Sequence, residues 1–120
     1  MLKESILKSF NTCFIILGNI IIFTIIINIL NSYININPVI SSVFNGLLEM
    51  TSGIKSISML NISLKYKIIL TSFILNFSGL SIIFQSRSIL SDYKINIKKI
   101  LIVKLVFSIL VALLATICTT

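Results

Sequence analysis

The chain has 120 residues, of which 57% are hydrophobic and only 11% are charged, and its formal net charge is +7. A soluble domain usually carries about 25% charged residues, so a soluble fold of this length could not bury so much apolar surface. The composition therefore predicts an integral membrane protein whose excess apolar surface faces lipid.

The residue inventory also excludes several kinds of chemistry. The sequence contains no histidine and only three carboxylates, so most of the groups used in acid–base catalysis and metal binding are absent. Cys13 and Cys118 both lie in apolar runs and have no metal-binding spacing. We therefore expect no enzyme and no cofactor. The basic residues lie mostly between apolar runs, where they orient a membrane protein, so nucleic acid is not an expected partner.

The first predicted element is a transmembrane helix over residues 12–31, preceded by a polar, basic and cytoplasmic N-terminus at residues 1–11. Cys13–Leu30 contains 18 residues without charge. As a helix this run is about 27 Å long, close to the hydrocarbon thickness of a bilayer. A signal peptide is the alternative, but its apolar part has about 7–15 residues and ends at small residues. The polar loop Asn31–Asn37 offers no such cleavage site, so an uncleaved helix is expected.

The second apolar segment, residues 39–62, predicts a re-entrant hairpin instead of a simple span. Pro38 suits the first turn of a helix, but the middle of the segment holds Glu49 and Lys55. A charge at the centre of a transmembrane helix costs about 2.5–3.5 kcal/mol. The hairpin is expected to have two short arms and a break between them, at Val39–Leu48, Ile54–Ile62 and Glu49–Gly53 respectively.

The third segment, residues 68–86, predicts a transmembrane helix that is broken at 76–79. Ile68–Phe84 contains no charge, but its centre is the polar and small sequence Asn-Phe-Ser-Gly. A break at membrane depth is tolerated where it is buried in protein or faces a water-filled cavity. After a basic loop, residues 100–119 form the last predicted span, and Lys104 lies one turn inside its start. We expect the long side chain of this lysine to reach the membrane interface.

The basic residues of the loops distinguish three layouts. If every segment spans, four basic residues lie on each side of the membrane. If residues 39–62 re-enter, six basic residues lie on the side of the N-terminus and two lie on the opposite side. If residues 68–86 re-enter, all eight lie on the same side. The positive-inside rule alone favours the third layout. We prefer the second because 39–62 contains the intramembrane charges and Ile68–Phe84 contains none. This layout puts residues 87–99 in the cytoplasm and residues 61–67 on the opposite side.

Two stretches of the sequence resemble signatures of a known family. Gly46–Ile54 reads Gly-Leu-Leu-Glu-Met-Thr-Ser-Gly-Ile and resembles the Gly-Leu-Leu-Glu-x-Thr-x-Gly-Ile pattern of the YlbJ family of bacterial sporulation integral membrane proteins. Leu75–Ile82 resembles the Phe-Gly-Gly-Leu-Ser-Ile signature of that family. The likeness implies the C-terminal portion of a longer protein, with a gate, or nucleoside-recognition, domain at residues 12–119 in the bacterial cell membrane.

The same stretches are more distantly similar to concentrative nucleoside transporters, in which a hairpin and a discontinuous helix hold the substrate. By motif position, the resemblance gives Glu49 the role of holding a ribose and places Asn76 beside it. Gly79 stands where those transporters have a second serine, and Leu48 stands where they have an asparagine. The candidate substrate-binding residues are Glu49, Thr51, Asn76, Ser78 and Ser81. For the last three, contacts between helices are the alternative role.

Helix geometry predicts that the two breaks lie at a similar depth. Asn76 follows Ile68 by eight residues, or about 12 Å of helix, and the hairpin break follows an arm of about 15 Å. Both depths are near the middle of a hydrocarbon core about 30 Å thick. We therefore expect Glu49 and Asn76 to converge on one polar site near the midplane, or to hydrogen-bond each other and fix the packing.

These elements predict an all-α integral membrane fold with three transmembrane helices, one of them discontinuous, and a re-entrant hairpin. This arrangement corresponds to one half of a transporter-like repeat fold. We expect the other half to come from a missing N-terminal repeat, a second subunit or a homodimer mate. The expected function is a sporulation-associated partial permease module for a small polar solute such as a nucleoside. A non-transporting membrane scaffold or partner subunit in spore formation is the alternative, and a holin-like pore former is a third.

Membrane integration is directly testable. Because three runs of 17–19 residues are almost free of charge, the chain is expected to remain with membranes through a carbonate wash. Fractionation of expressing cells, followed by immunoblotting, measures this. Release of the chain into the soluble fraction would contradict the whole interpretation.

Overall fold

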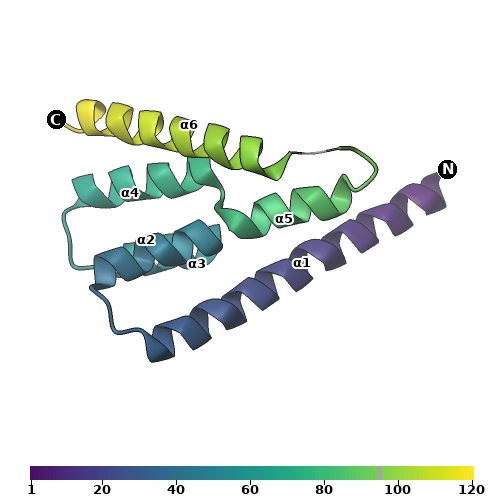
Figure 1. The fold of residues 1–120 in the computed structure, drawn as a ribbon, viewed down its shortest axis with the longest axis horizontal. Helices are drawn as coiled ribbons and strands as arrows, with labels where there is room; N and C mark the ends of the chain where they lie inside the picture. Colours follow the sequence, from purple (N-terminus) through teal and green to yellow (C-terminus); the bar gives the residue numbers. More distant parts are fainter. Residues whose placement is uncertain (95) are drawn as a thin grey trace.

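The computed structural model describes residues 1–94 and 96–120, and this part of the chain contains helices and no strand. In chain order, the helices are α1 (Leu2–Tyr33), α2 (Pro38–Leu48), α3 (Met50–Ser58), α4 (Leu64–Phe77), α5 (Gly79–Ile89) and α6 (Ile97–Cys118). Helices α1 and α6 are the outer elements, and α2 to α5 lie between them (Figure 1). Three stretches, α1, α4–α5 and α6, are long and apolar enough to cross a membrane. The predicted fold class is therefore confirmed.

The bundle is more polar inside than outside. The buried apolar side chains include Ile27, Ile57, Ile74, Phe77 and Ile83, and the buried polar ones include Ser42, Asn45, Glu49, Ser81, Gln85 and Ser108. By contrast, only 6% of the most apolar window of α1, and 6% of that of α6, is buried. Apolar patches of this extent are not left open to water, whereas in a bilayer they contact lipid. The chain is an integral membrane protein, as its composition predicts.

Helices α2 and α3 form a helical hairpin in the predicted segment, and its re-entry into the membrane stays a prediction. They have 11 and 9 residues, so they are about 16 Å and 14 Å long and reach about halfway across the hydrocarbon core. The side chain of Asn37 caps α2 by accepting a hydrogen bond from the Val39 N–H at 2.9 Å, and Pro38 takes the first helical position. The second arm begins at Met50, four residues earlier than expected, because Glu49 alone forms the break.

The third span is broken at Ser78, within the predicted interval. Helix α4 ends at Phe77 and α5 begins at Gly79. Ser78 and Gly79 both have left-handed backbone, with φ values of 70° and 75°. This conformation costs a serine about 1–2 kcal/mol, whereas glycine adopts it readily. The break is therefore a specific feature held in place by the surrounding packing.

The break also changes the helix against which this span packs. Helix α4 packs along α6 and against α3, whereas α5 packs against α1 and α2. In Figure 1, α5 accordingly turns away from α6 and toward α1. About 33% of the α4–α5 window is buried, far more than of α1 or α6. The broken span is therefore the central element of the bundle.

The two ends of the molecule carry different charge. The N-terminus of α1 and the loop between α5 and α6 lie at one end, and the connection between α3 and α4 lies at the other (Figure 1). Helix α1 has 32 residues, so its first residues, which belong to the predicted N-terminal segment, extend the helix beyond a core about 30 Å thick. The first end carries Lys3, Lys8, Arg87, Lys94, Lys98 and Lys99, and the second carries Lys65 and Lys67, with Lys55 in the last turn of α3.

This arrangement predicts the orientation of the chain, because the end with more basic residues is retained in the cytoplasm. Ser63→Cys and Ser91→Cys, made separately in a Cys13→Ala and Cys118→Ala background, place one thiol at each end. Both serines are exposed. An impermeant maleimide added to intact cells is expected to label the first variant only. Labelling of both variants from the same side would contradict the re-entrant hairpin.

Candidate functional site

The two helix breaks meet inside the bundle. A Cβ atom at Gly79, the first residue of α5, would lie 3.0 Å from the Met50 backbone N and 3.4 Å from the Glu49 Cα. The start of α5 therefore touches the turn between α2 and α3. A glycine is needed here for its small size as well as for its positive φ. The predicted meeting of the breaks is thus seen in the backbone.

Two further glycines allow the hairpin arms to pack backbone against backbone. A Cβ atom at Gly53, on α3, would overlap the Cα and N atoms of Gly46 on α2. A Cβ atom at Gly46 would also lie 2.8 Å from Cγ1 of Ile74, on α4. Both glycines lie in the Gly-Leu-Leu-Glu-Met-Thr-Ser-Gly stretch. This stretch therefore has a role in helix packing that does not depend on a ligand. Close contacts of this kind between small residues are typical of helices in membranes.

Glu49 is the N-cap of α3, and its side chain is only 2% exposed. Its Oε1 accepts a hydrogen bond from the Thr51 N–H at 3.1 Å. Its Oε2 accepts from the Ser52 N–H at 2.9 Å, from the Ser52 hydroxyl at 2.9 Å and from the Thr51 hydroxyl at 2.5 Å. The positive end of the helix dipole also favours a negative charge at this position, by up to about 2 kcal/mol.

These contacts explain how a carboxylate is kept inside the membrane. Hydrogen bonds to a charged group contribute about 1.5–3 kcal/mol each, so four of them exceed the cost of about 2.5–3.5 kcal/mol for inserting the charge. All four go to Thr51 and Ser52. Lys55, the other charge in the segment, is exposed and makes no hydrogen bond to Glu49. The carboxylate is therefore satisfied by the first turn of its own helix.

Asn76 does not share this environment. Its side chain is exposed, and its Nδ2 donates a hydrogen bond to the Ser72 carbonyl one turn earlier at 2.9 Å. Among the described residues, no hydrogen bond joins it to Glu49. The inward positions of α4 next to the break are taken by Ile74 and Phe77, which leaves Asn76 on the outer face. The backbones of the two breaks thus converge, but these two side chains do not, and a binding role for Asn76 stays a prediction.

The other candidate residues of the broken helix differ in burial. The Ser78 hydroxyl donates to the Leu75 carbonyl at 3.2 Å and helps to end α4. Ser81 is fully buried, and its Oγ accepts a hydrogen bond from Nε2 of Gln85 at 3.2 Å. The sequence analysis did not single out Gln85, although its spacing of four residues from Ser81 puts both on one face of a helix.

Asn45 is a second buried polar residue that the sequence analysis did not select. It lies on α2 one turn before Glu49 and is 5% exposed. Its Oδ1 is buried and accepts no hydrogen bond from a described residue. A buried acceptor without a donor costs about 1–3 kcal/mol. The signal in the sequence was the spacing of Ser42 and Asn45, which places two polar residues on one face of α2 just before Glu49.

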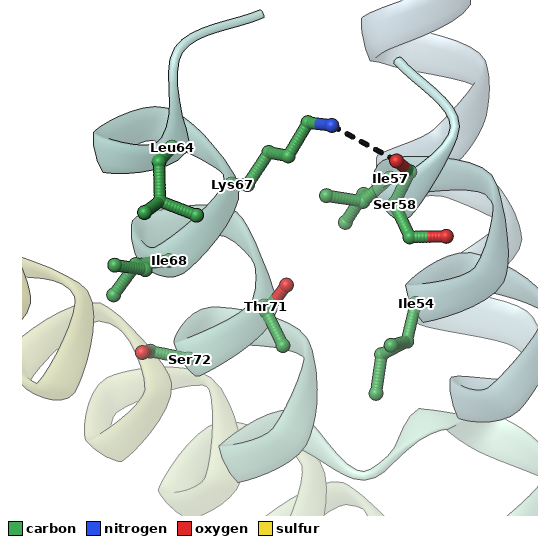
Figure 2. A pocket seen from close by; sticks show the side chains of 8 residues that line it. All are labelled: Ile54, Ile57, Ser58, Leu64, Lys67, Ile68, Thr71 and Ser72. Carbon is green, nitrogen blue, oxygen red and sulfur yellow. Dashed lines mark hydrogen bonds between the residues drawn. The ribbon is translucent and has the colours of Figure 1, made fainter.

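A cavity of about 300 Å³ lies between α3 and α4 (Figure 2). It is lined by Ile54, Ile57, Ser58, Leu64, Lys67, Ile68, Thr71 and Ser72. Figure 2 shows the Lys67 ammonium extending across the gap to the Ser58 carbonyl, to which it donates a hydrogen bond at 2.9 Å. A lysine at this position satisfies a carbonyl near the C-terminal end of α3. The cavity is mainly apolar and is not lined by any of the five predicted site residues.

The described residues hold no group of three or more His, Cys, Asp or Glu side chains placed to bind a metal ion. Cys13 and Cys118 are exposed free thiols. The polar groups of the two breaks are therefore the candidate site, and their chemistry is hydrogen bonding.

An apolar exterior, a polar interior and a helical hairpin against a broken span define a multi-pass membrane protein. The chain is a distant homologue of the sporulation integral membrane protein YlbJ of Bacillus subtilis, with 31% identity over 123 aligned residues. The alignment covers 88% of this chain and 30% of that protein, so the chain spans less than a third of the relative's length. No protein-family model matches the chain. No solved structure matches it either.

The glycine contact in the hairpin can be tested with a matched pair of variants. Gly53→Ala is expected to lower the free energy of unfolding by about 1–3 kcal/mol or more, because the added methyl group overlaps backbone atoms. Gly18→Ala is the control, since a Cβ there has nothing within 4 Å and alanine favours a helix by about 1 kcal/mol. Thermal unfolding in detergent, followed by circular dichroism, measures both. Equal melting temperatures for the two variants would show that the arms are not in contact.

Proposed function

We propose that this chain is a membrane module of a sporulation-associated protein, and that the meeting point of its two breaks is half of a site for a small polar solute. The sporulation role is supported by the homologue, whose name describes a sporulation integral membrane protein. The solute role is supported by the architecture, because secondary transporters bind substrates at broken helices near the midplane. The gate, or nucleoside-recognition, type of site is suggested by the two sequence signatures.

One observation carries the solute proposal: the buried Oδ1 of Asn45, which accepts no hydrogen bond from a described residue. A solute hydroxyl is a suitable donor for this acceptor. Glu49 follows four residues later at the turn into α3, and its Oε1 accepts only one described hydrogen bond. A carboxylate oxygen has about two acceptor positions, so this oxygen can take a second donor. Two buried residues with free acceptor positions, close in sequence at the hairpin turn, suit a ligand with more than one hydroxyl, such as a ribose.

The module is proposed to act together with a second half. Transporters of this kind use two repeats with the site between them, and the described helices supply one hairpin and one broken span. A further repeat, a partner subunit or a second copy of this chain can provide the opposite wall. We therefore infer that the chain does not transport a solute alone.

A second function is favoured by a specific observation, namely that most polar groups of the interior are satisfied internally. All four hydrogen bonds of Glu49 lie within the hairpin, and Ser81 and Gln85 pair within α5. Such contacts serve packing without any ligand. A non-transporting scaffold or partner subunit in spore formation would need no more than this.

Asn45→Leu separates the two functions. Leucine has a similar size and removes an unsatisfied acceptor, so the variant is expected to reach normal membrane levels and to melt at the same or a higher temperature. If the solute proposal holds, the variant is expected to lose up to about tenfold in solute affinity, since one hydrogen bond is worth about 0.5–1.5 kcal/mol. A host strain that lacks the natural gene and carries this variant is then expected to form fewer heat-resistant spores. Glu49→Gln is expected to act in the same direction.

Asn28→Leu is the matched control, because Asn28 is an exposed amide on α1. It is expected to leave spore counts unchanged. Full sporulation with Asn45→Leu would support the scaffold and contradict the solute site. Normal sporulation after deletion of the natural gene would contradict the sporulation role itself.

A further inference from the structure

Two cations without a partner line one cavity between α5 and α6. Arg87 is in the last turn of α5, and Lys104 lies on α6, seven residues or about 10.5 Å after Ile97. Both line a cavity of about 210 Å³ together with Ile83, Ser86, Ile97 and Ile100. Within residues 1–94 and 96–120, neither side chain donates a hydrogen bond to the protein or pairs with a carboxylate.

The cavity exists because of the helix break. Before the break the span packs along α6, and after it the span packs against α1 and α2. Helix α5 is set off from α6 at the break and approaches the start of α6 toward the basic end of the molecule (Figure 1). The long side chains of Arg87 and Lys104 lie in the space between them. The cavity thus lies at the basic end of the molecule, between the last turns of α5 and the first turns of α6.

The carboxylates of the chain do not neutralise these two cations. Glu49 is bonded to Thr51 and Ser52 within the hairpin, and Glu4 and Asp92 are exposed. Lys104 is half-buried and lies within the last span, whereas Arg87 is exposed. An anion in the cavity that both residues line would neutralise them and accept hydrogen bonds from both.

A second, larger cavity indicates the chemistry of the rest of the ligand. It has a volume of about 570 Å³ and is lined by Arg87, Ser91, Tyr93, Lys94 and Asn96. Arg87 lines both cavities, so a polar, basic outer space adjoins an inner one lined by three isoleucines. A polar, basic cavity beside an apolar one suits an amphiphile at the membrane interface, whose headgroup is polar and whose chain is apolar. A free phosphate would use only the polar part.

We propose that this space binds an anionic phospholipid such as phosphatidylglycerol. The phosphate accepts hydrogen bonds from the Arg87 guanidinium and the Lys104 ammonium, and Lys94 is near the headgroup. One acyl chain lies along Ile83, Ile97 and Ile100. Basic pockets between transmembrane helices are a known means of anionic lipid recognition, and the planar guanidinium suits a phosphate.

Native mass spectrometry of the full chain in detergent tests this proposal. Phosphatidylglycerol is expected to bind at least about tenfold more tightly than phosphatidylcholine with the same acyl chains, because a charge-assisted hydrogen bond is worth this much. Arg87→Gln and Lys104→Gln are each expected to reduce phosphatidylglycerol affinity about tenfold or more. Lys98→Gln is the matched control: this lysine is exposed near both cavities and lines neither. Lys98→Gln is expected to reduce phosphatidylglycerol affinity by at most about fivefold, the effect of removing one charge near a membrane surface.

Three outcomes would overturn the proposal. Equal binding of the two lipids by the unmodified chain would do so without any variant. Equal losses in all three variants would indicate diffuse surface charge. Displacement of the lipid by inorganic phosphate at millimolar concentration would indicate a site for free phosphate. Circular dichroism confirms that each variant is folded, and Arg87→Lys, which keeps the charge, is expected to retain more of the binding than Arg87→Gln.

Discussion

Glu49 ends α2 and begins α3 without a connecting loop, and its carboxylate is satisfied within that turn by Thr51 and Ser52. This single-residue reversal brings Gly46 opposite Gly53, because nothing between the arms holds them apart. The reversal also leaves the backbone at the tip of the hairpin open to close contact. Gly79, the first residue of α5, packs against the backbone of Glu49 and Met50 there. The position of the broken span therefore depends on the turn that the Glu49 carboxylate caps.

The remaining packing follows from the solvent. Lipid chains are as apolar as isoleucine, so burying apolar side chains contributes little to holding helices together in a bilayer. Glycine contacts and polar side chains supply the specificity instead. This accounts for an interior that contains Ser81, Gln85 and Asn45 while the apolar residues of α1 and α6 face outward. Two candidate site residues, Glu49 and Ser81, consequently also belong to the buried interior, which is why stability and function must be measured separately for each variant.

The sequence predicts the elements of this fold well because each has a strong signal: long uncharged runs for the spans, buried charge for the hairpin, and Asn-Phe-Ser-Gly for the break. Side-chain direction was harder to predict. Asn76 lies two residues before the left-handed pair Ser78 and Gly79, and the inward positions of α4 depend on how α4 packs against the hairpin, which no local pattern encodes. Asn45 and Gln85 were not selected because the free-energy cost of inserting an uncharged amide into a membrane is small compared with that of a charge. The predicted binding role of the five candidate residues is a separate question that geometry alone does not answer.

The short arms of the hairpin also bear on the order in which the protein enters the membrane. With 11 and 9 residues, neither α2 nor α3 is long enough to be inserted as an independent span. Their ends carry backbone groups that hydrocarbon cannot satisfy, so they need protein around them before they leave the interface. The surface they require is the broken span, which follows them in the chain. We therefore expect the hairpin to stay at the membrane interface until α4 and α5 have been inserted, so that insertion does not follow the order of the sequence.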